Sequence, residues 1–269
     1  MIIDSHEHVM FPTELQIEKM DKAEIDKAVL FTTTPHPEKA FSLNEFKSEM
    51  SILFKILGGE NTLEINKKRM KKDILDLTEV IKKYPDRFYG FGPVPLGMTF
   101  ENTELWIKKY IIENNLKGVG EFTPGNDEQI NQLETVFKVM KKIISEENRI
   151  LPVWVHTFNP VTLNGIKILE KLTEKYSEIP VIFGHMGGYN WLEVADFVKN
   201  TSNAYIDLSG TFSTLAVKMV INEVPEKCLY SSDAPYGEPI LNKQMIEYLI
   251  PSKKIKNKVF GENILKLLK

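Results

Sequence analysis

The 269-residue sequence contains only one cysteine, three arginines and five histidines. The single cysteine, Cys228, excludes an internal disulfide framework and is typical of proteins from a reducing compartment. No apolar run approaches the roughly 18 residues that a transmembrane helix requires, and no basic segment precedes an apolar one at the start of the chain. We therefore expect a soluble, cytoplasmic protein without a membrane partner.

The charge balance gives no reason to expect a polyanionic partner. The formal net charge is −3, which provides no electrostatic attraction for nucleic acid. Hydrophobic residues make up 42% and charged residues 26% of the chain, close to the averages for soluble globular proteins. A chain of this length buries enough surface to fold without a structural metal. Metal-ligating residues would therefore indicate a functional metal and not a structural one. We expect the substrate to be a small molecule.

Short β-type runs alternate with longer helix-type segments along the whole chain. The predicted strands are 2–6, 27–32, 88–94, 118–122, 149–156, 180–185, 204–209 and 227–233. Apolar residues at helical spacing predict helices over 66–87, 127–148, 162–180 and 189–203. Several strand runs lack polar alternation, which is typical of parallel strands covered on both faces.

This alternation predicts an α/β protein of the (β/α)8 TIM barrel type, with residues 1–269 forming a single domain. An open, doubly wound sheet would require a glycine-rich phosphate turn after its first strand. The chain has "HEHVMFP" at that place. One connection, about 35–60, is too long for a barrel loop and rich in apolar residues. We expect it to form either a lid over the site or the subunit interface of a homodimer.

Four of the five histidines fall at the ends of predicted strands. His6 and His8 are two residues apart, so in a strand both side chains point to the same face. His156 and His185 end two later strands, and Asp233 ends the last one. Active sites of barrels form at the carboxyl ends of the strands. Imidazoles and a carboxylate together are the ligand set of a catalytic divalent ion, most simply zinc.

Other residues at the same end are candidates for further roles. Glu121 ends the predicted strand 118–122, where a carboxylate can bridge two ions or act as an acid–base group. The remaining candidates are substrate contacts: His36, Trp154, Tyr189 and Tyr236. A loop hydrogen bond is the alternative for His36, and filling the barrel is the alternative for Trp154. Whether the site holds one ion or two stays open.

The order of these motifs resembles the amidohydrolase superfamily over nearly the whole chain. The motifs are "HEH", a histidine on the fifth strand, "FGHMGG", "SSDAPYG" and the closing "FGENILKLL". They are most similar to the amidohydrolase-related branch, which includes decarboxylases of the aminocarboxymuconate-semialdehyde type. The resemblance implies that His6, His8, His156 and Asp233 bind a divalent metal. It implies that His185 is either a ligand of a second metal or a group that polarises the substrate carbonyl.

Three reactions remain open at this stage. Metal-assisted hydrolysis of an amide, ester or lactone, with Asp233 as the proton acceptor, is the leading hypothesis. Decarboxylation requires a carboxylate substrate that arginine usually binds, and the positions of Arg69, Arg87 and Arg149 predict no arginine at the barrel mouth. Glu121 is similar to the strand-4 glutamate of TatD-type metal nucleases, but the acidic balance argues against nucleic acid.

Overall fold

A computed structural model describes residues 1–268 of the chain. Eight parallel strands follow one another around a single sheet in sequence order, so each strand pairs with its neighbour in the chain. This arrangement confirms the predicted (β/α)8 barrel. The strands are β1 Ile3–His8, β2 Lys27–Phe31, β3 Phe88–Gly92, β4 Gly118–Phe122, β5 Val153–His156, β6 Val181–Gly184, β7 Ala204–Asp207 and β8 Cys228–Leu229.

Backbone hydrogen bonds between β1 and the segment after β8 complete the circle. The Ser5 amide donates to the Tyr230 carbonyl, and the His8 amide donates to the Ala234 carbonyl. The amide of Asp233 donates to the carbonyl of His6. The first and last parts of the barrel are therefore joined where the sequence places its histidine pair.

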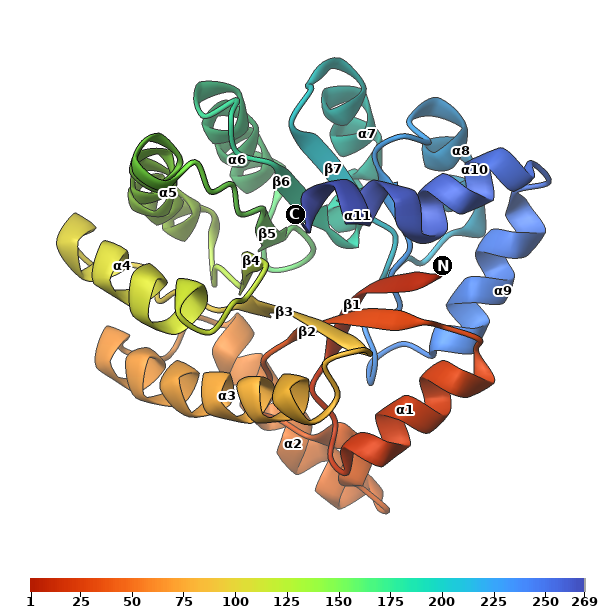
Figure 1. Cartoon of the computed structure of the whole chain (residues 1–269), viewed down its shortest axis with the longest axis horizontal. Coiled ribbons are helices and arrows are strands. Elements are labelled where there is room, and N and C mark those ends of the chain that lie inside the picture. The colour runs from red at the N-terminus through yellow and green to blue at the C-terminus, as the bar shows by residue number, and fades with distance from the viewer. Residues whose placement is uncertain (269) are drawn as a thin grey trace.

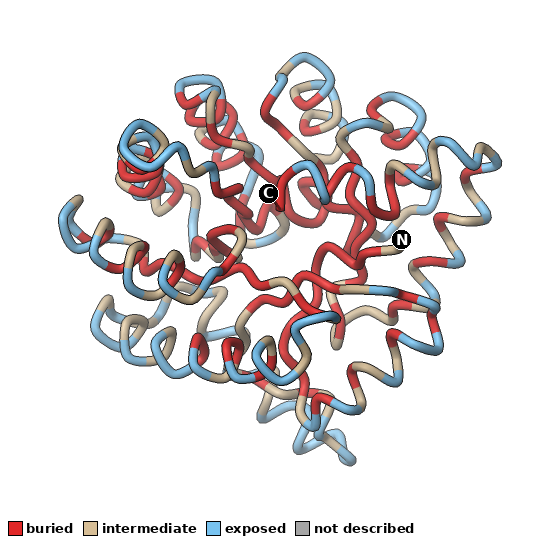
Figure 2. Tube along the Cα trace, in the orientation of Figure 1, coloured by how far each residue is buried: buried red, intermediate tan, exposed pale blue. Residues whose placement is uncertain are grey.

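Most of the helices form an outer ring around the strands, and α11 lies across one end of the barrel (Figure 1). Their bounds are α1 Thr13–Lys22, α2 Leu43–Leu57, α3 Leu63–Lys83, α4 Phe100–Trp106, α5 Leu133–Glu147, α6 Leu163–Lys175, α7 Trp191–Asn200, α8 Thr214–Glu223, α9 Pro239–Leu249, α10 Lys253–Asn257 and α11 Asn263–Leu267. Buried residues follow the strands and the inward faces of these helices, and the outward faces are exposed (Figure 2). No helix in residues 1–268 is long and apolar enough to cross a membrane.

The interior of the barrel is filled by large side chains below the histidines. Trp154 is fully buried, and its ring lies 5.0 Å from that of Phe31 and 4.8 Å from the imidazole of His6, centroid to centroid. Residues of α11, including Ile264 and Leu267, pack against the same cluster and close the other end of the barrel. Trp154 therefore fills the barrel beneath the candidate site, as the packing alternative predicted.

Several predicted boundaries differ from the observed ones. The predicted strand 227–233 corresponds to β8, which is only two residues long. After Leu229 the chain leaves the strand conformation, and its backbone bonds to β1. The predicted helix 127–148 begins with a 3-10 segment, Asp127–Gln132, before α5. The start of β1 is later than predicted, and this strand extends through both histidines to His8.

The long connection after β2 forms helix α2. Ser42 and Glu45 make a capping box that starts the helix. No residue of α2 is fully buried, and Phe46 and Phe54 remain exposed. Leu53 of the same helix lines the cavity at the carboxyl ends of the strands. A lid role and a subunit-interface role both remain predictions for this segment.

The core packing generates a stability prediction. Replacing Trp154 by alanine should lower the free energy of unfolding by about 3–5 kcal/mol, because a large side chain is removed from a filled barrel. Leu75→Ala, on the exposed face of α3, is the control and should change it by less than about 0.5 kcal/mol. Urea unfolding followed by circular dichroism measures both. Similar losses in the two variants would refute the proposed packing role of Trp154.

Candidate metal centre

The two histidines of "HEH" enter the site from the end of β1. Both project to the inside of the barrel, where their ring centroids are 5.0 Å apart. Glu7, between them, turns to the opposite face and accepts a hydrogen bond from the side chain of Gln16. The alternation expected of a strand therefore places both imidazoles on one side of the barrel wall.

Asp233 joins these two histidines to form a first group of donor atoms. Its Oδ1 lies 3.2 Å from Nε2 of His8 and 3.7 Å from Nε2 of His6. Asp233 does not end a strand, as the sequence suggested, but lies four residues beyond β8 with a left-handed backbone at φ 61°. The hydrogen bond from its amide to the carbonyl of His6 holds it beside β1 instead.

Glu121, His156 and His185 form a second group. The Oε1 atom of Glu121 lies 3.0 Å from Nδ1 of His156 and 3.2 Å from Nε2 of His185. All three side chains are nearly inaccessible to solvent. They come from β4, from β5 and from the residue directly after β6, so three consecutive strands deliver them to one point.

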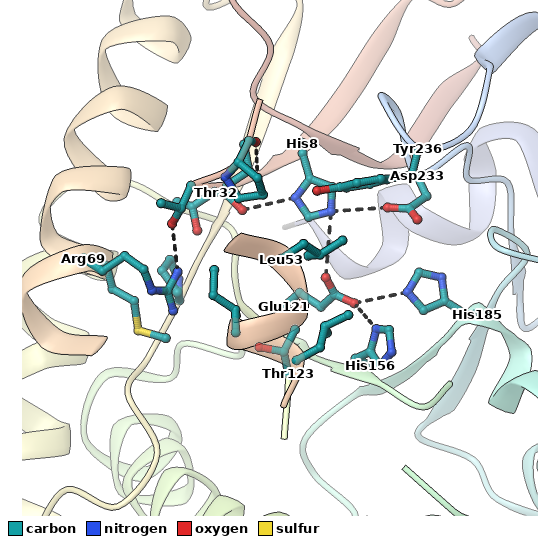
Figure 3. Close-up of a pocket in the computed structure, with 17 residues that line it drawn as sticks. His8, Thr32, Leu53, Arg69, Glu121, Thr123, His156, His185, Asp233 and Tyr236 are labelled. Carbon is teal, nitrogen blue, oxygen red and sulfur yellow. Dashed lines mark hydrogen bonds and ion pairs between the residues drawn. The ribbon is translucent and has the colours of Figure 1, made fainter. Parts of the chain in front are cut away.

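Glu121 faces both groups with different oxygen atoms. While Oε1 contacts the second group, Oε2 lies 3.8 Å from Nε2 of His6 and 3.9 Å from Nε2 of His8. Figure 3 shows the Glu121 carboxylate in the middle of the cluster. Burial alone would raise its pKa, but hydrogen bonds with His156 and His185 hold the pKa well below its usual range. The carboxylate is therefore ionised and lies where a bridging ligand would lie.

Each of the four histidines also has its second ring nitrogen beside an oxygen atom. A ring nitrogen that donates to such an oxygen leaves the other nitrogen free as a metal ligand, which is the usual arrangement in metal sites. The pairs are His6 Nδ1 with Asp207 Oδ2 at 3.1 Å, His8 Nδ1 with the Thr32 carbonyl at 3.1 Å, His156 Nε2 with the Asn159 carbonyl at 3.1 Å, and His185 Nδ1 with Ser209 Oγ at 2.9 Å.

Asp207 and Ser209 were not predicted from the sequence. Asp207 is the last residue of β7 and Ser209 follows two residues later, in "IDLSG", and both are buried. The available signal was an acidic residue at the carboxyl end of a strand. It resembles the signal that identified Glu121.

The donor set fits a divalent ion. Nε2 of His6 is buried and has no hydrogen-bond partner within residues 1–268, although it faces two carboxylates. An orphaned imidazole nitrogen of this kind is costly unless a ligand occupies it. His6, His8 and Asp233 each offer one donor atom within 4.8 Å of the others, and so do Glu121, His156 and His185. These two sets of three donors lie side by side, and a third set, His6, His185 and Asp207, shares one histidine with each of them.

A cavity of about 130 Å³ opens above these groups. Hydroxyl and apolar side chains line it along with the metal-binding candidates, and Leu53 of α2 covers one side (Figure 3). Of the four predicted substrate contacts, only Tyr236 lines this cavity. Its ring stands edge-on to that of His8, with centroids 5.7 Å apart, and its buried hydroxyl has no hydrogen-bond partner in the described part of the chain.

The structure places the other predicted contacts elsewhere. His36 lies 2.9 Å from a carboxylate oxygen of Glu38 and packs against Phe11. Tyr189 is 74% exposed and stacks near Phe158 outside the cavity. The His36 and Tyr189 side chains therefore contact neighbouring side chains and do not line the cavity, which residue type alone could not reveal.

Arg69 corrects the expectation that no arginine reaches the barrel mouth. It lies on α3 and lines the cavity together with Glu121 and the histidines (Figure 3). One terminal nitrogen of its guanidinium lies 3.2 Å from Oγ1 of Thr34 and 3.3 Å from Oδ2 of Asp73. The other donates to Asn66 at 3.3 Å. The sequence placed Arg69 on a helix correctly, but not the direction in which its long side chain extends.

A barrel with four histidines and two carboxylates at one end defines a metal-dependent barrel enzyme. A family model described as Amidohydrolase matches residues 69–269, well over half of the chain. The protein therefore belongs to the amidohydrolase family, in agreement with the resemblance seen in its motifs. No curated protein matches the sequence.

Solved structures share this fold at low sequence identity. A Staphylococcus aureus protein classed provisionally as an amidohydrolase is 19% identical, with a TM-score of 0.70 and 99% of each chain covered. 2,6-Dihydroxybenzoate decarboxylase from Rhizobium is 16% identical, with a TM-score of 0.66 and coverage of 99% of this chain and 98% of the other. A dihydroxybenzoic acid decarboxylase from Polaromonas sp. JS666 with bound manganese is 16% identical, with a TM-score of 0.69 and coverage of 99% and 96%.

Metal binding to this centre should release protons. Burial by itself lowers the pKa of His185, but its hydrogen bond to Glu121 and the charge of Asp233 raise that pKa to about 10 in the metal-free protein. We therefore expect His185 to be protonated at pH 8, so that a metal which binds its Nε2 atom must displace that proton. Calorimetric titration of metal-free protein with Mn²⁺ at pH 8, in buffers of different ionisation enthalpy, should report about one proton or more released per chain.

The His185→Gln variant is the control, and its proton release should be smaller by about one. Because the proton is lost as the pH rises through about 10, metal affinity should increase with pH up to that value. Identical binding enthalpies in all buffers would contradict the assignment of His185 as a metal ligand.

Proposed function

We propose that the protein is a metal-dependent hydrolase that acts on a small amide, ester or lactone with the help of two divalent ions. The observation that carries this proposal is the position of Glu121, whose two carboxylate oxygens face two different groups of donors. A carboxylate shared between two metal sites is a common feature of hydrolytic centres with two ions. Imidazole-rich sites suit zinc, and the manganese of one structural relative makes manganese the second candidate.

Each side chain has a role that follows from its position. Bound divalent ions supply Lewis acidity and lower the pKa of a coordinated water to about 7. Asp233 is the more accessible carboxylate, with 16% of its side chain exposed against 8% for Glu121. It is therefore placed to take the proton of the attacking water and return it to the leaving group. The unpartnered hydroxyl of Tyr236 can donate to a substrate oxygen.

Arg69 indicates that the substrate carries a negative charge. It is the only arginine or lysine among the residues that line the cavity. Its Nε is buried without a hydrogen-bond partner among the described residues, although both terminal nitrogens are engaged. A guanidinium in this state can bind a carboxylate that replaces or joins its weak contacts. We infer that the substrate is a small organic acid.

Decarboxylation is the second candidate function. The position of Arg69 removes the main objection drawn from the sequence, and two of the similar structures named above are decarboxylases. In that reaction His6, His8 and Asp233 would hold a single ion, which would supply Lewis acidity to the bound substrate. His185 would then remain free to protonate the carbon that loses carbon dioxide. The two reactions therefore differ in the role of Glu121 and His185.

Product analysis distinguishes the two functions. Protein loaded with zinc or manganese is offered a panel of small lactones and N-acyl amino acids, and separately 2,6-dihydroxybenzoate. We expect hydrolysis of a panel member with one oxygen atom from labelled water in the product acid. Asp233→Asn should lower this rate by about 10²- to 10⁴-fold. Release of carbon dioxide from 2,6-dihydroxybenzoate without turnover of the panel would contradict the hydrolase proposal.

Removing the positive charge of Arg69 should weaken substrate binding. Arg69→Met should raise KM for an acidic panel substrate about 10- to 100-fold, the cost of losing a charged hydrogen-bond partner. The methyl amide of the same substrate should be affected much less. Arg87→Met is the matched control, because Arg87 binds Asp21 and the Asp26 carbonyl away from the cavity. Equal effects on the acid and the amide would refute a carboxylate contact.

A further inference from the structure

One buried carboxylate, Asp207, contacts a histidine of the first donor group directly and is linked to one of the second group through Ser209. Its Oδ2 lies 3.1 Å from Nδ1 of His6, which belongs to the first group. The same oxygen accepts a hydrogen bond from Oγ of Ser209 at 2.9 Å, and Oδ1 accepts from the backbone amide of Ser209. Oγ of Ser209 in turn lies 2.9 Å from Nδ1 of His185, which belongs to the second group.

The directions of these hydrogen bonds follow from the chemistry of the partners. Both carboxylate oxygens of Asp207 accept hydrogen bonds from Ser209, one from its backbone amide and the other from its hydroxyl, so Asp207 acts as the acceptor. The hydroxyl of Ser209 has one proton and gives it to Asp207. The oxygen of Ser209 must therefore accept a hydrogen bond from the Nδ1–H group of His185. Asp207 thus fixes the Nδ1–H form of both imidazoles, and both Nε2 atoms face the site.

The backbone next to Ser209 is adapted to this contact. Gly210 has a left-handed backbone at φ 61°, and a Cβ atom there would lie 2.9 Å from Nδ1 of His185. Ser209 and Asp207 are 1% and 0% exposed, so no water competes for their hydrogen bonds from the surface. Only glycine at position 210 leaves space for the imidazole to reach the hydroxyl of Ser209.

We propose that Asp207 is a positioning residue shared by both metal sites, and that Ser209 extends its effect to the second site alone. The proposal rests on the two-ion centre of the proposed function and assigns the outer ligands of that centre. His6 contacts Asp207 directly, whereas His185 depends on Ser209. Removal of the serine hydroxyl should therefore weaken one metal site, and removal of the aspartate charge should weaken both.

Metal affinity measured directly on the full chain tests this difference. Metal-free wild-type protein, Ser209→Ala and Asp207→Asn are titrated with Mn²⁺ and with Zn²⁺ in the presence of a competing chelator. For Ser209→Ala we expect one of two dissociation constants to rise about 10- to 100-fold, the usual effect of losing such a partner, while the other stays within about threefold. For Asp207→Asn both constants should rise.

Three further variants make the result specific. His156→Ala removes a ligand of the second group, so it identifies which constant belongs to that site, and Ser209→Ala must weaken the same one. Ser209→Thr keeps the hydroxyl and should restore binding. Ser231→Ala is the matched control, because Ser231 is an equally buried serine that donates only to the carbonyl of Leu229. Urea unfolding of each metal-free variant separates metal affinity from folding.

The outcomes separate this proposal from the proposed function. Unchanged metal dissociation constants in Ser209→Ala and Asp207→Asn would overturn the positioning role. Equal weakening of both sites by Ser209→Ala would overturn it as well. If wild-type protein bound only one ion, the two-ion hydrolase would be refuted. Asp207→Asn should nevertheless weaken that single ion and Ser209→Ala should not, because His6 contacts Asp207 without the serine. Failure of this pattern as well would refute both.

Discussion

The site depends on one buried negative charge, the carboxylate of Glu121. Taking a carboxylate out of water costs several kcal/mol unless partners compensate it. Here the compensation comes from imidazoles on both sides of Glu121, so the carboxylate and the histidines require one another. In the metal-free chain, a proton on His185 provides positive charge beside Glu121. In the proposed function, a divalent ion replaces that proton, so the same donor atoms serve the metal-free and the metal-bound site.

The barrel makes this arrangement possible because it brings strand ends that are distant in sequence to one point. Glu121 from β4 lies opposite His6 and His8 from β1, and the backbone bonds of the 230–234 segment to β1 complete the ring. Below the site, Trp154 fills the barrel and supports the ring of His6. A layer of polar donors therefore lies on a layer of packed aromatic side chains. This arrangement keeps water away from all but one side of the centre.

Much of this was readable from the sequence, because strand-end positions in a barrel follow from periodicity. His6, His8 and Glu121 lie where alternation and strand ends place them. Asp233 was found by its motif, although its strand ends earlier than expected and β1 holds it. Arg69 was missed because a helix pattern fixes the Cα position but not where a long side chain extends. Asp207 was missed because single acidic residues near strand ends commonly cap or turn the chain.

The most direct test of the two-ion centre is the metal content per chain, measured by elemental analysis of protein purified without chelators. Glu121→Ala is measured beside it, with Glu128→Ala, at an exposed position, as the control. If the centre holds two ions, we expect about two ions per chain in the wild type and the control, and about one in Glu121→Ala. About one ion in all three proteins would contradict it, because Glu121 would then not be a bridging ligand and the single-ion decarboxylase would become the better description.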